Sequence, residues 1–383
     1  MPLLAEPLYV LAMLASLVAL AEWVGRRRGF RQIGSALIVI LAAALLANIG
    51  LLPTSSNAPP LYEGIFGYVA PLAIFFLLLD VRLRDVRLAG VPMLLLFGLG
   101  AVTTIVGTIF GYRLIDPAAH GLAHAPAVAG MFTGTYIGGS VSLNAVALHY
   151  GVVQDGTLFA AINAADNVIT TLWIVATLLL PRILQRFFPR KQAFWKAPTT
   201  GGPESLSATR ESVAVSGVAL LLALGTGSLL VAQVCSRFIP ALPTVLVLTT
   251  LALLLAQVPA VQKLRGARTL GYFAVLLFLA VIGAYCDLGA LLANGAAAIL
   301  LLQWVTIIVA CHAVLLFLIG GLCRQDWVVI SIASNANIGG ATSAGVLATA
   351  LGRDELRLPG ILVGSLGNAL GTYAGIAVAE WLR

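Results

Sequence analysis

Apolar runs of roughly 18 or more residues recur from one end of this chain to the other, and runs of that length can cross a bilayer as helices. Of the 383 residues, 60% are hydrophobic and 10% are charged. Soluble domains carry about 25% charged residues. We therefore expect an all-α integral membrane protein, placed in the plasma (inner) membrane.

The apolar segments are separated by short polar or basic loops and by one longer polar stretch. That stretch, 182–211, contains Pro198-Thr199-Thr200-Gly201-Gly202-Pro203 and is expected to form a flexible cytoplasmic linker that divides the chain. The predicted segments are 8–24, 33–52, 64–80, 90–112, 126–150, 157–181, 212–235, 241–257, 270–286, 295–320, 327–351 and 358–381.

A polar stretch with a glycine pair interrupts one apolar segment in each half of the chain. Ile137-Gly138-Gly139 recurs as Ile338-Gly339-Gly340 at an offset of 201 residues, and the same offset aligns Asn167 with Asn368. A fixed register over two consecutive segments indicates an internal repeat. The predicted repeats cover 1–181 and 212–383, and their broken segments are 126–150 and 327–351.

The positive charges indicate how the two repeats are oriented. If every apolar segment crossed the membrane, Lys and Arg would be divided almost evenly between the two sides. If the glycine-pair segments enter and leave on one side, only Arg113, Arg237 and Arg383 of the 22 basic residues lie outside, as the positive-inside rule favours. The repeats are then inverted. We expect about ten spanning helices and two glycine-broken helices that are re-entrant (or discontinuous).

Both glycine-pair stretches carry hydroxyl and amide side chains at membrane depth, where polar groups persist only if protein or a water-filled cavity surrounds them. A broken helix exposes N–H groups that suit an anion, and carbonyls that suit a hard cation such as sodium. We therefore predict a solute and ion site. Its residues are Thr133, Thr135, Gly138, Gly139, Ser140 and Ser142, with Ser334, Asn335, Asn337, Gly339, Gly340, Thr342 and Ser343.

The segment after each glycine pair carries more polar residues. Asn163, Asp166 and Asn167 lie near the start of one, and Asp166 is the only acid well inside an apolar segment. An intramembrane carboxylate indicates a sodium ligand or a proton carrier, unless it pairs with a buried basic or amide group for structure alone. The mirror residues Asn368 and Thr372 are uncharged. The predicted sodium ligands are Asp166, Asn167, Asn335 and Asn368.

Helix packing through small residues is the alternative explanation of the glycines. Packing does not need Asn335 or Asn337, and His312 in segment 295–320 is expected to be a hydrogen-bonded core histidine. The glycines that we assign to packing are Gly130, Gly134, Gly360, Gly364, Gly367, Gly371 and Gly375.

The sequence contains no motif of a known enzyme class among those sought. We find no H-E-x-x-H motif, P-loop or G-x-S-x-G motif, and the four cysteines have neither metal-ligand spacing nor a disulfide pattern. The net charge of +7 comes from loops that set membrane orientation, so it does not indicate nucleic-acid binding. We expect no catalytic activity and no cofactor besides a coupling ion.

The second glycine-pair region resembles a known family. Ser334-Asn335-Ala336-Asn337-Ile338-Gly339-Gly340, then Pro359–Gly364 and Gly371-Thr372-Tyr373, is similar to the DUF819 (YjcL-like) membrane proteins, a family of unknown function. The resemblance covers most of the chain. More distantly, the paired hairpins resemble sodium-coupled citrate and glutamate symporters and the bile-acid-symporter group. That likeness implies an elevator mechanism and a homodimer; in the bile-acid branch the broken helices cross the membrane.

These observations favour an ion-coupled secondary transporter of elevator type for a small, anionic organic solute. Sodium is preferred to protons because most predicted ligands are neutral oxygens that do not titrate. No arginine lies in the predicted site, so helix N-termini and amides would bind a carboxylate. The alternatives are a proton-coupled transporter, a channel, and a membrane scaffold or sensor that keeps the fold without transport.

Overall fold

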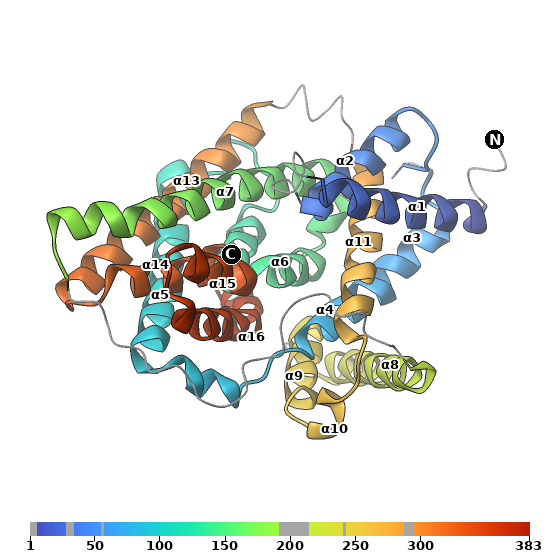
Figure 1. Cartoon of the computed structure of the whole chain (residues 1–383). Coiled ribbons are helices and arrows are strands. Elements are labelled where there is room, and N and C mark those ends of the chain that lie inside the picture. The colour runs from blue at the N-terminus through green and yellow to red at the C-terminus, as the bar shows by residue number, and fades with distance from the viewer. Residues whose placement is uncertain (1–5, 28–33, 55–56, 191–213, 240–242, 287–294) are drawn as a thin grey trace.

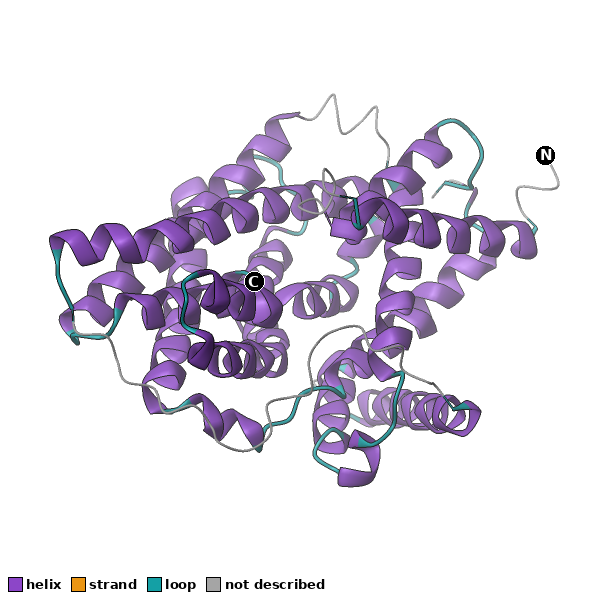
Figure 2. Cartoon of the chain, in the orientation of Figure 1, coloured by secondary structure: helices purple, strands orange, loops and turns teal. Residues whose placement is uncertain are grey.

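The described parts of the chain are helical (Figures 1 and 2). The computed structural model describes residues 6–27, 34–54, 57–190, 214–239, 243–286 and 295–383, and no strand occurs in these ranges. The all-α fold expected from the composition is therefore confirmed.

Among these residues, eight helices are long and apolar enough to cross a membrane. α2 (Gly34–Asn48) and α9 (Thr244–Leu255) have 15 and 12 residues, so crossing by these two, which ten spans require, stays a prediction. The eight are α1 (Pro7–Gly25); α3 (Pro60–Gly64), η3 (Ile65–Val69) and α4 (Ala70–Leu78) as one helix; α5 (Val91–Ile115); α7 (Gly156–Phe187); α8 (Val215–Phe238); α11 (Ala267–Tyr285); α13 (Gly295–Leu322); and η6 (Asp354–Leu356) with α16 (Arg357–Leu382).

The predicted linker 182–211 begins as helix. α7 continues past Pro181 to Phe187, because Arg182, Leu184, Gln185 and Arg186 are good helix formers. Residues 191–213 lie outside the described ranges.

The helices form two groups that pack mainly within themselves (Figure 1). In the flanking group, α11 packs on α1, α2 and α4, while α8 and α9 pack on α4. In the hairpin group, α6 (Ala125–His149), α14 (Trp327–Ile338) and α15 (Gly340–Ala350) pack on α16, with α5, α7 and α13 around them. The turn η4 (Asp85–Ala89) lies in the connection that leads from α4 to α5. Each group therefore takes helices from both halves of the chain.

α6 turns back on itself at Gly139, whose φ of 69° and ψ of −170° are not helical. In a continuous helix Gly134 and Ser142 would lie about 12 Å apart. Instead, a Cβ placed on Gly134 would lie 3.4 Å from Ser142. A Cβ on Gly375 of α16 would meet both arms, at 2.6 Å from Gly130 O and 2.8 Å from Val146 Cγ2. We call residues 125–149 hairpin 1.

α14 and α15 form a second hairpin, which turns at Gly340 with φ +80°. A Cβ placed on Gly360 of α16 would lie 2.8 Å from Ile332 and 3.4 Å from Ala344, so both arms face the same glycine. Asp326 immediately precedes α14 and Arg353 follows α15, and their side chains form an ion pair at 2.9 Å. We call residues 326–353 hairpin 2.

The two hairpins meet midway along α16. The turn of hairpin 1 lies on Gly367, where Ile137 O occupies the space of a side chain, and its open end lies by Glu380, which accepts from the Tyr150 hydroxyl at 2.7 Å. The turn of hairpin 2 lies on Gly364, beside Ala341. The assignment of these glycines to helix packing is therefore confirmed.

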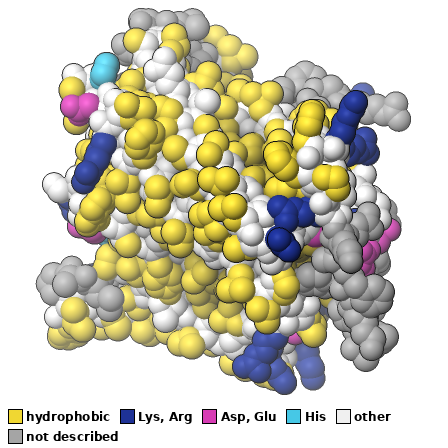
Figure 3. All heavy atoms as spheres, turned by 90° about the vertical axis from the view of Figure 1, so that its left-hand side faces the viewer, with side chains coloured by type: hydrophobic (Ala, Val, Ile, Leu, Met, Phe, Trp, Pro, Cys, Tyr) yellow, Lys and Arg dark blue, Asp and Glu magenta, His cyan; other side chains and the backbone are white. Residues whose placement is uncertain are grey.

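Basic residues lie at both ends of the hairpin group. Arg113 stacks on Trp381 and Arg383 on Tyr150, at the end where hairpin 1 opens. Arg190 stacks on Trp327 at the opposite end, where hairpin 2 opens. On the face drawn in Figure 3, a broad apolar surface has Lys and Arg side chains toward its margins. Basic side chains therefore lie beside the open ends of both hairpins.

Gly139→Ala is expected to lower the free energy of unfolding by about 1–3 kcal/mol, because its φ and ψ fall in a region open essentially to glycine alone. Gly98→Ala on α5 is the control. A Cβ there has no neighbour within 4 Å and alanine favours helix, so stability should hold or rise. Thermal unfolding in detergent measures both. An unchanged midpoint for Gly139→Ala would contradict the turn at this residue.

Candidate functional site

Asn335 and Asn337, at the tip of hairpin 2, have buried amide groups with atoms that lack a hydrogen-bond partner among the described residues. Both side chains are 0% exposed. Neither amide atom of Asn335, nor Oδ1 of Asn337, has a partner among the described residues. An unsatisfied buried polar group costs about 1–3 kcal/mol. A bound solute or ion that supplied the partners would remove this cost.

The Asn335 amide lies against the glycine turn. A Cβ placed on Gly339 would lie 2.5 Å from Asn335 Oδ1, so only glycine leaves room for the amide. The Ser343 hydroxyl also lies against Gly339, and it donates to Gly340 O at 3.0 Å. Asn335, Gly339, Gly340 and Ser343 therefore form one cluster.

The Asn337 amide faces α5. Its Nδ2 donates to Phe97 O at 3.2 Å and to Ala333 O at 3.1 Å, which leaves Oδ1 for a ligand. Gly100 permits this contact, since a Cβ there would overlap the amide.

Ser334 is held in a network that joins four helices. Trp173 Nε1 on α7 donates to Ser334 Oγ at 3.1 Å, and Ser334 Oγ lies 2.9 Å from His312 Nε2 on α13. His312 Nδ1 lies 3.0 Å from Gly100 O, which can only accept, so Nδ1 carries the proton and Nε2 accepts from Ser334. The expected core histidine is confirmed, and the Ser334 hydroxyl both donates and accepts a hydrogen bond within the protein.

A row of buried threonines on α5 extends this network, and the glycine motifs did not reveal it. His312 Nδ1 lies 3.2 Å from Thr103 Oγ1 and 3.0 Å from Thr104 Oγ1. Further along α5, Thr133 of hairpin 1 donates to Thr108 at 3.2 Å. The signal in the sequence is a face of small residues at helical spacing: Gly100, Thr104, Gly107, Thr108 and Gly111.

The tip of hairpin 1 brings a second set of predicted site residues together on α16. Ser142 packs against Gly371 and accepts from the Thr372 hydroxyl at 3.4 Å. Asn368 Oδ1 lies 3.8 Å from the place of a Cβ on Gly139. Gly138 and Thr135 are buried, whereas Ser140 in hairpin 1 and Thr342 in hairpin 2 are exposed.

Asp166 on α7 lies beside hairpin 1. The Thr170 hydroxyl donates to Asp166 Oδ1 at 3.5 Å, and the buried Tyr136 hydroxyl faces the same carboxylate without closing a hydrogen bond. Asp166 takes part in no ion pair within the described ranges. The amides of Asn163 and Asn167 donate to the backbone of their own helix, at 3.0 and 2.8 Å.

Sequence comparisons agree with the resemblance seen in the glycine-pair regions. A family model described as "Protein of unknown function (DUF819)" matches residues 9–383. The chain belongs to the DUF819 family. It is 28% identical to the "Uncharacterized membrane protein YjcL" of Bacillus subtilis (strain 168) over 388 residues, which cover 94% of this chain and 95% of the relative. Because the described residues contain eight apolar helices of membrane-spanning length, and because of this relative, we conclude that the chain is an integral membrane protein.

In this DUF819 protein the structure brings some of the predicted site residues together at each hairpin tip, whereas Asn163, Asp166 and Asn167 lie on α7. In the described part of the chain, no hydrogen bond joins Asp166, Asn167, Asn335 and Asn368, the predicted sodium ligands, to one another. The described residues also contain no group of three or more His, Cys, Asp and Glu side chains that could hold a metal ion. Amide, hydroxyl and backbone oxygens are the donors that these tips offer to a cation.

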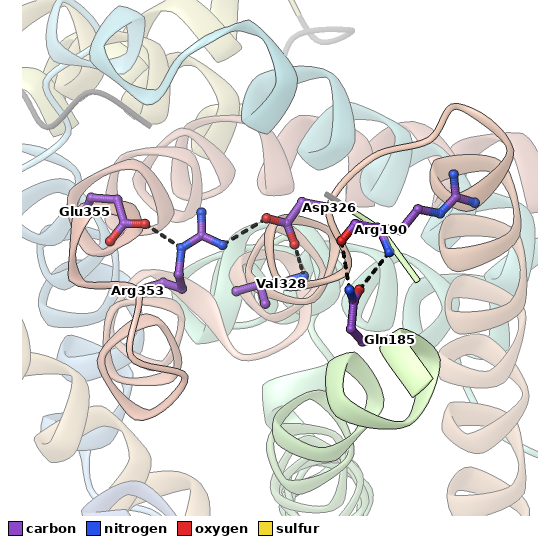
Figure 4. A network of polar contacts seen from close by, with 6 residues as sticks. All are labelled: Gln185, Arg190, Asp326, Val328, Arg353 and Glu355. Atoms are coloured by element: carbon purple, nitrogen blue, oxygen red, sulfur yellow. Dashed lines mark hydrogen bonds and ion pairs between the residues drawn. The ribbon is translucent and has the colours of Figure 1, made fainter. Parts of the chain in front are cut away.

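Charged residues hold the base of hairpin 2 (Figure 4). Arg353 pairs with Asp326 at 2.9 Å and also with Glu355, and Asp326 accepts from the first turn of α14. Nearby, Gln185 exchanges two hydrogen bonds with the backbone of Arg190 at the end of α7. Hairpin 2 therefore combines a firmly connected base with a tip that carries unsatisfied amides.

Two neighbouring substitutions separate structural from ligand-binding polar groups. Ser334→Ala removes the acceptor of Trp173 and the donor to His312, so it should lower the free energy of unfolding by about 1–3 kcal/mol. Asn335→Ala removes an amide without partners, so the ligand-free protein should be equally or more stable. Thermal unfolding without ligand compares the two. A larger loss for Asn335→Ala would mean that its amide has a structural role.

Proposed function

We propose that this protein is an ion-coupled secondary transporter of a small organic solute, with sodium as the coupling ion. The observation that carries the proposal is the pair of buried amides with unsatisfied atoms, Asn335 and Asn337, near the place where two glycine turns meet on α16. A site that is filled only while a solute and an ion are bound accounts for polar groups that the protein itself does not satisfy.

The two halves of the chain are, in this proposal, inverted repeats. In support, the glycine-broken α6 is followed by α7 in the first half, and the glycine-broken pair α14 and α15 is followed by α16 in the second. The turns also approach α16 from its opposite ends. Broken helices that meet near the midplane from inverted halves are typical of secondary transporters.

The mechanism that we propose is an elevator-type alternating access. The hairpin group, which contains both tips, would slide as a transport domain against the flanking group, which would serve as the scaffold. The packing of helices mainly within each group supports this division. A homodimer in the plasma membrane, formed through the scaffold, completes the proposal.

The chemistry of the tip favours a solute with an anionic group together with a cation. α15 begins at Gly340, so its first N–H groups face the turn and suit a carboxylate. The Asn335 amide adds two N–H donors and one acceptor oxygen. The last carbonyls of α14, with Oδ1 of Asn335 and Asn337, are neutral oxygens of the kind that bind sodium.

Solute binding can be found with a thermal-shift screen of small acids, peptides and sugars on the purified protein, in sodium and in choline. We expect one solute class to raise the midpoint, and more so in sodium. Asn335→Ala should weaken its binding at least tenfold, about the 1.4 kcal/mol of one hydrogen bond to a charged group. Asn48→Ala is the matched control, since its amide holds Cys286 O at 2.9 Å in the flanking group. Equal loss in both variants would contradict the site.

Uptake into proteoliposomes tests the coupling ion. We expect uptake that follows a sodium gradient and stops in choline. Equal uptake in both, with collapse under a protonophore, would instead favour proton coupling, for which Asp166 beside Tyr136 is the candidate carrier. A solute that binds without uptake would favour the scaffold or sensor.

A further inference from the structure

A basic pocket of about 590 Å³ lies where the chain passes from the flanking group to the hairpin group. Leu83, Arg84, Arg87 and Leu88, in the connection between α4 and α5, line it together with Gln257, which follows α9. The turn η4 in this connection packs on α16, whereas α9 belongs to the flanking group. The pocket therefore has walls from both helix groups.

Gln257 fixes the shape of this connection. Its Oε1 accepts from Leu83 N at 2.9 Å, and its Nε2 donates to Val81 O at 3.0 Å and to Leu253 O at 2.8 Å. Val86, in the turn η4 of this connection, is buried. Backbone groups already bind both Oε1 and Nε2 of Gln257, so this residue shapes the pocket without binding a ligand. The side chains available to bind a ligand are those of Arg84 and Arg87.

Arg84 and Arg87 supply the positive charge of this pocket. Neither forms an ion pair in the part of the chain that the structure describes, and Asp85 between them does not line the pocket. Arg84 caps the 3-10 turn η4 and Arg87 lies three residues later, and both residues line the pocket. Paired N–H donors of guanidinium groups match the oxygens of a phosphate.

We propose that this pocket binds the phosphate group of an anionic phospholipid from the surrounding leaflet. The helices on either side, α4 with α3 and η3, and α5, are both long enough to span a membrane, so the connection lies at the level of the headgroups. Leu83 and Leu88 line the same pocket and are 38% and 50% exposed, which gives an acyl chain apolar contact beside the arginines. Basic pockets between membrane helices on the cytoplasmic side recognise such headgroups.

Thermal unfolding of the delipidated full chain in detergent tests this site, with dioleoyl phosphatidylglycerol, dioleoyl phosphatidylcholine or inorganic phosphate as the added probe. We expect phosphatidylglycerol alone to raise the midpoint. The double variant Arg84→Gln/Arg87→Gln should bind it roughly 30-fold more weakly, as expected for two arginines at an anionic surface. Arg82→Gln/Arg186→Gln removes the same charge from exposed positions outside the pocket, and it should bind phosphatidylglycerol as the unsubstituted protein does.

Three results would overturn the proposal. Equal weakening in the two double variants would mean that the lipid responds to net charge alone. Stabilisation by inorganic phosphate as strong as that by phosphatidylglycerol, and lost with Arg84 and Arg87, would assign the phosphate site to a soluble ligand. Absence of any effect of phosphatidylglycerol would remove the site. The measurement needs no solute or ion gradient, so its failure would leave the transport proposal unaffected.

Discussion

Close backbone contact between α16 and the two hairpins is the interaction on which the rest of this structure depends. A Cβ placed on Gly371 would lie 2.7 Å from Gly138 Cα, and one on Gly364 would lie 2.5 Å from Ala341 Cα. In lipid, where no hydrophobic effect drives helices together, such close packing holds them in place. The glycines of α16 thereby place both turns, with their polar residues, near the middle of one helix.

Polar groups in this packed interior divide into those that the protein satisfies and those that it leaves open. Ser334 and Asn335 are neighbours on α14, yet Ser334 is bound by Trp173 and His312 while the Asn335 amide meets no partner. The network around Ser334 thus positions the helix, while the amide of the next residue has no partner in the described part of the chain. In the proposed transporter, a preorganised site of this kind would lose little conformational entropy on binding the solute.

The two hairpins are related in sequence but are held differently. Hairpin 2 is closed at its base by the buried pair of Asp326 and Arg353, whereas the positions aligned with them by the repeat offset are Ala125 and Val152. Hairpin 1 relies instead on its glycine contacts with α16. A buried ion pair fixes geometry only while both partners remain, so the base of hairpin 2 joins its two arms as one unit.

The sequence by itself determined the membrane class, the helical fold, the breaks at Gly139 and Gly340, and the glycines of α16 as packing residues. Those features can be predicted along the chain itself, from its composition, the spacing of its small residues and the conformational freedom of glycine. Only the tertiary structure decided that the Asn335 amide has no partner among the described residues, that Trp173 and His312 bind the Ser334 hydroxyl, and that the threonines of α5 join the network. Adjacent polar residues look alike in sequence, because whether a partner lies opposite depends on helices that are distant along the chain.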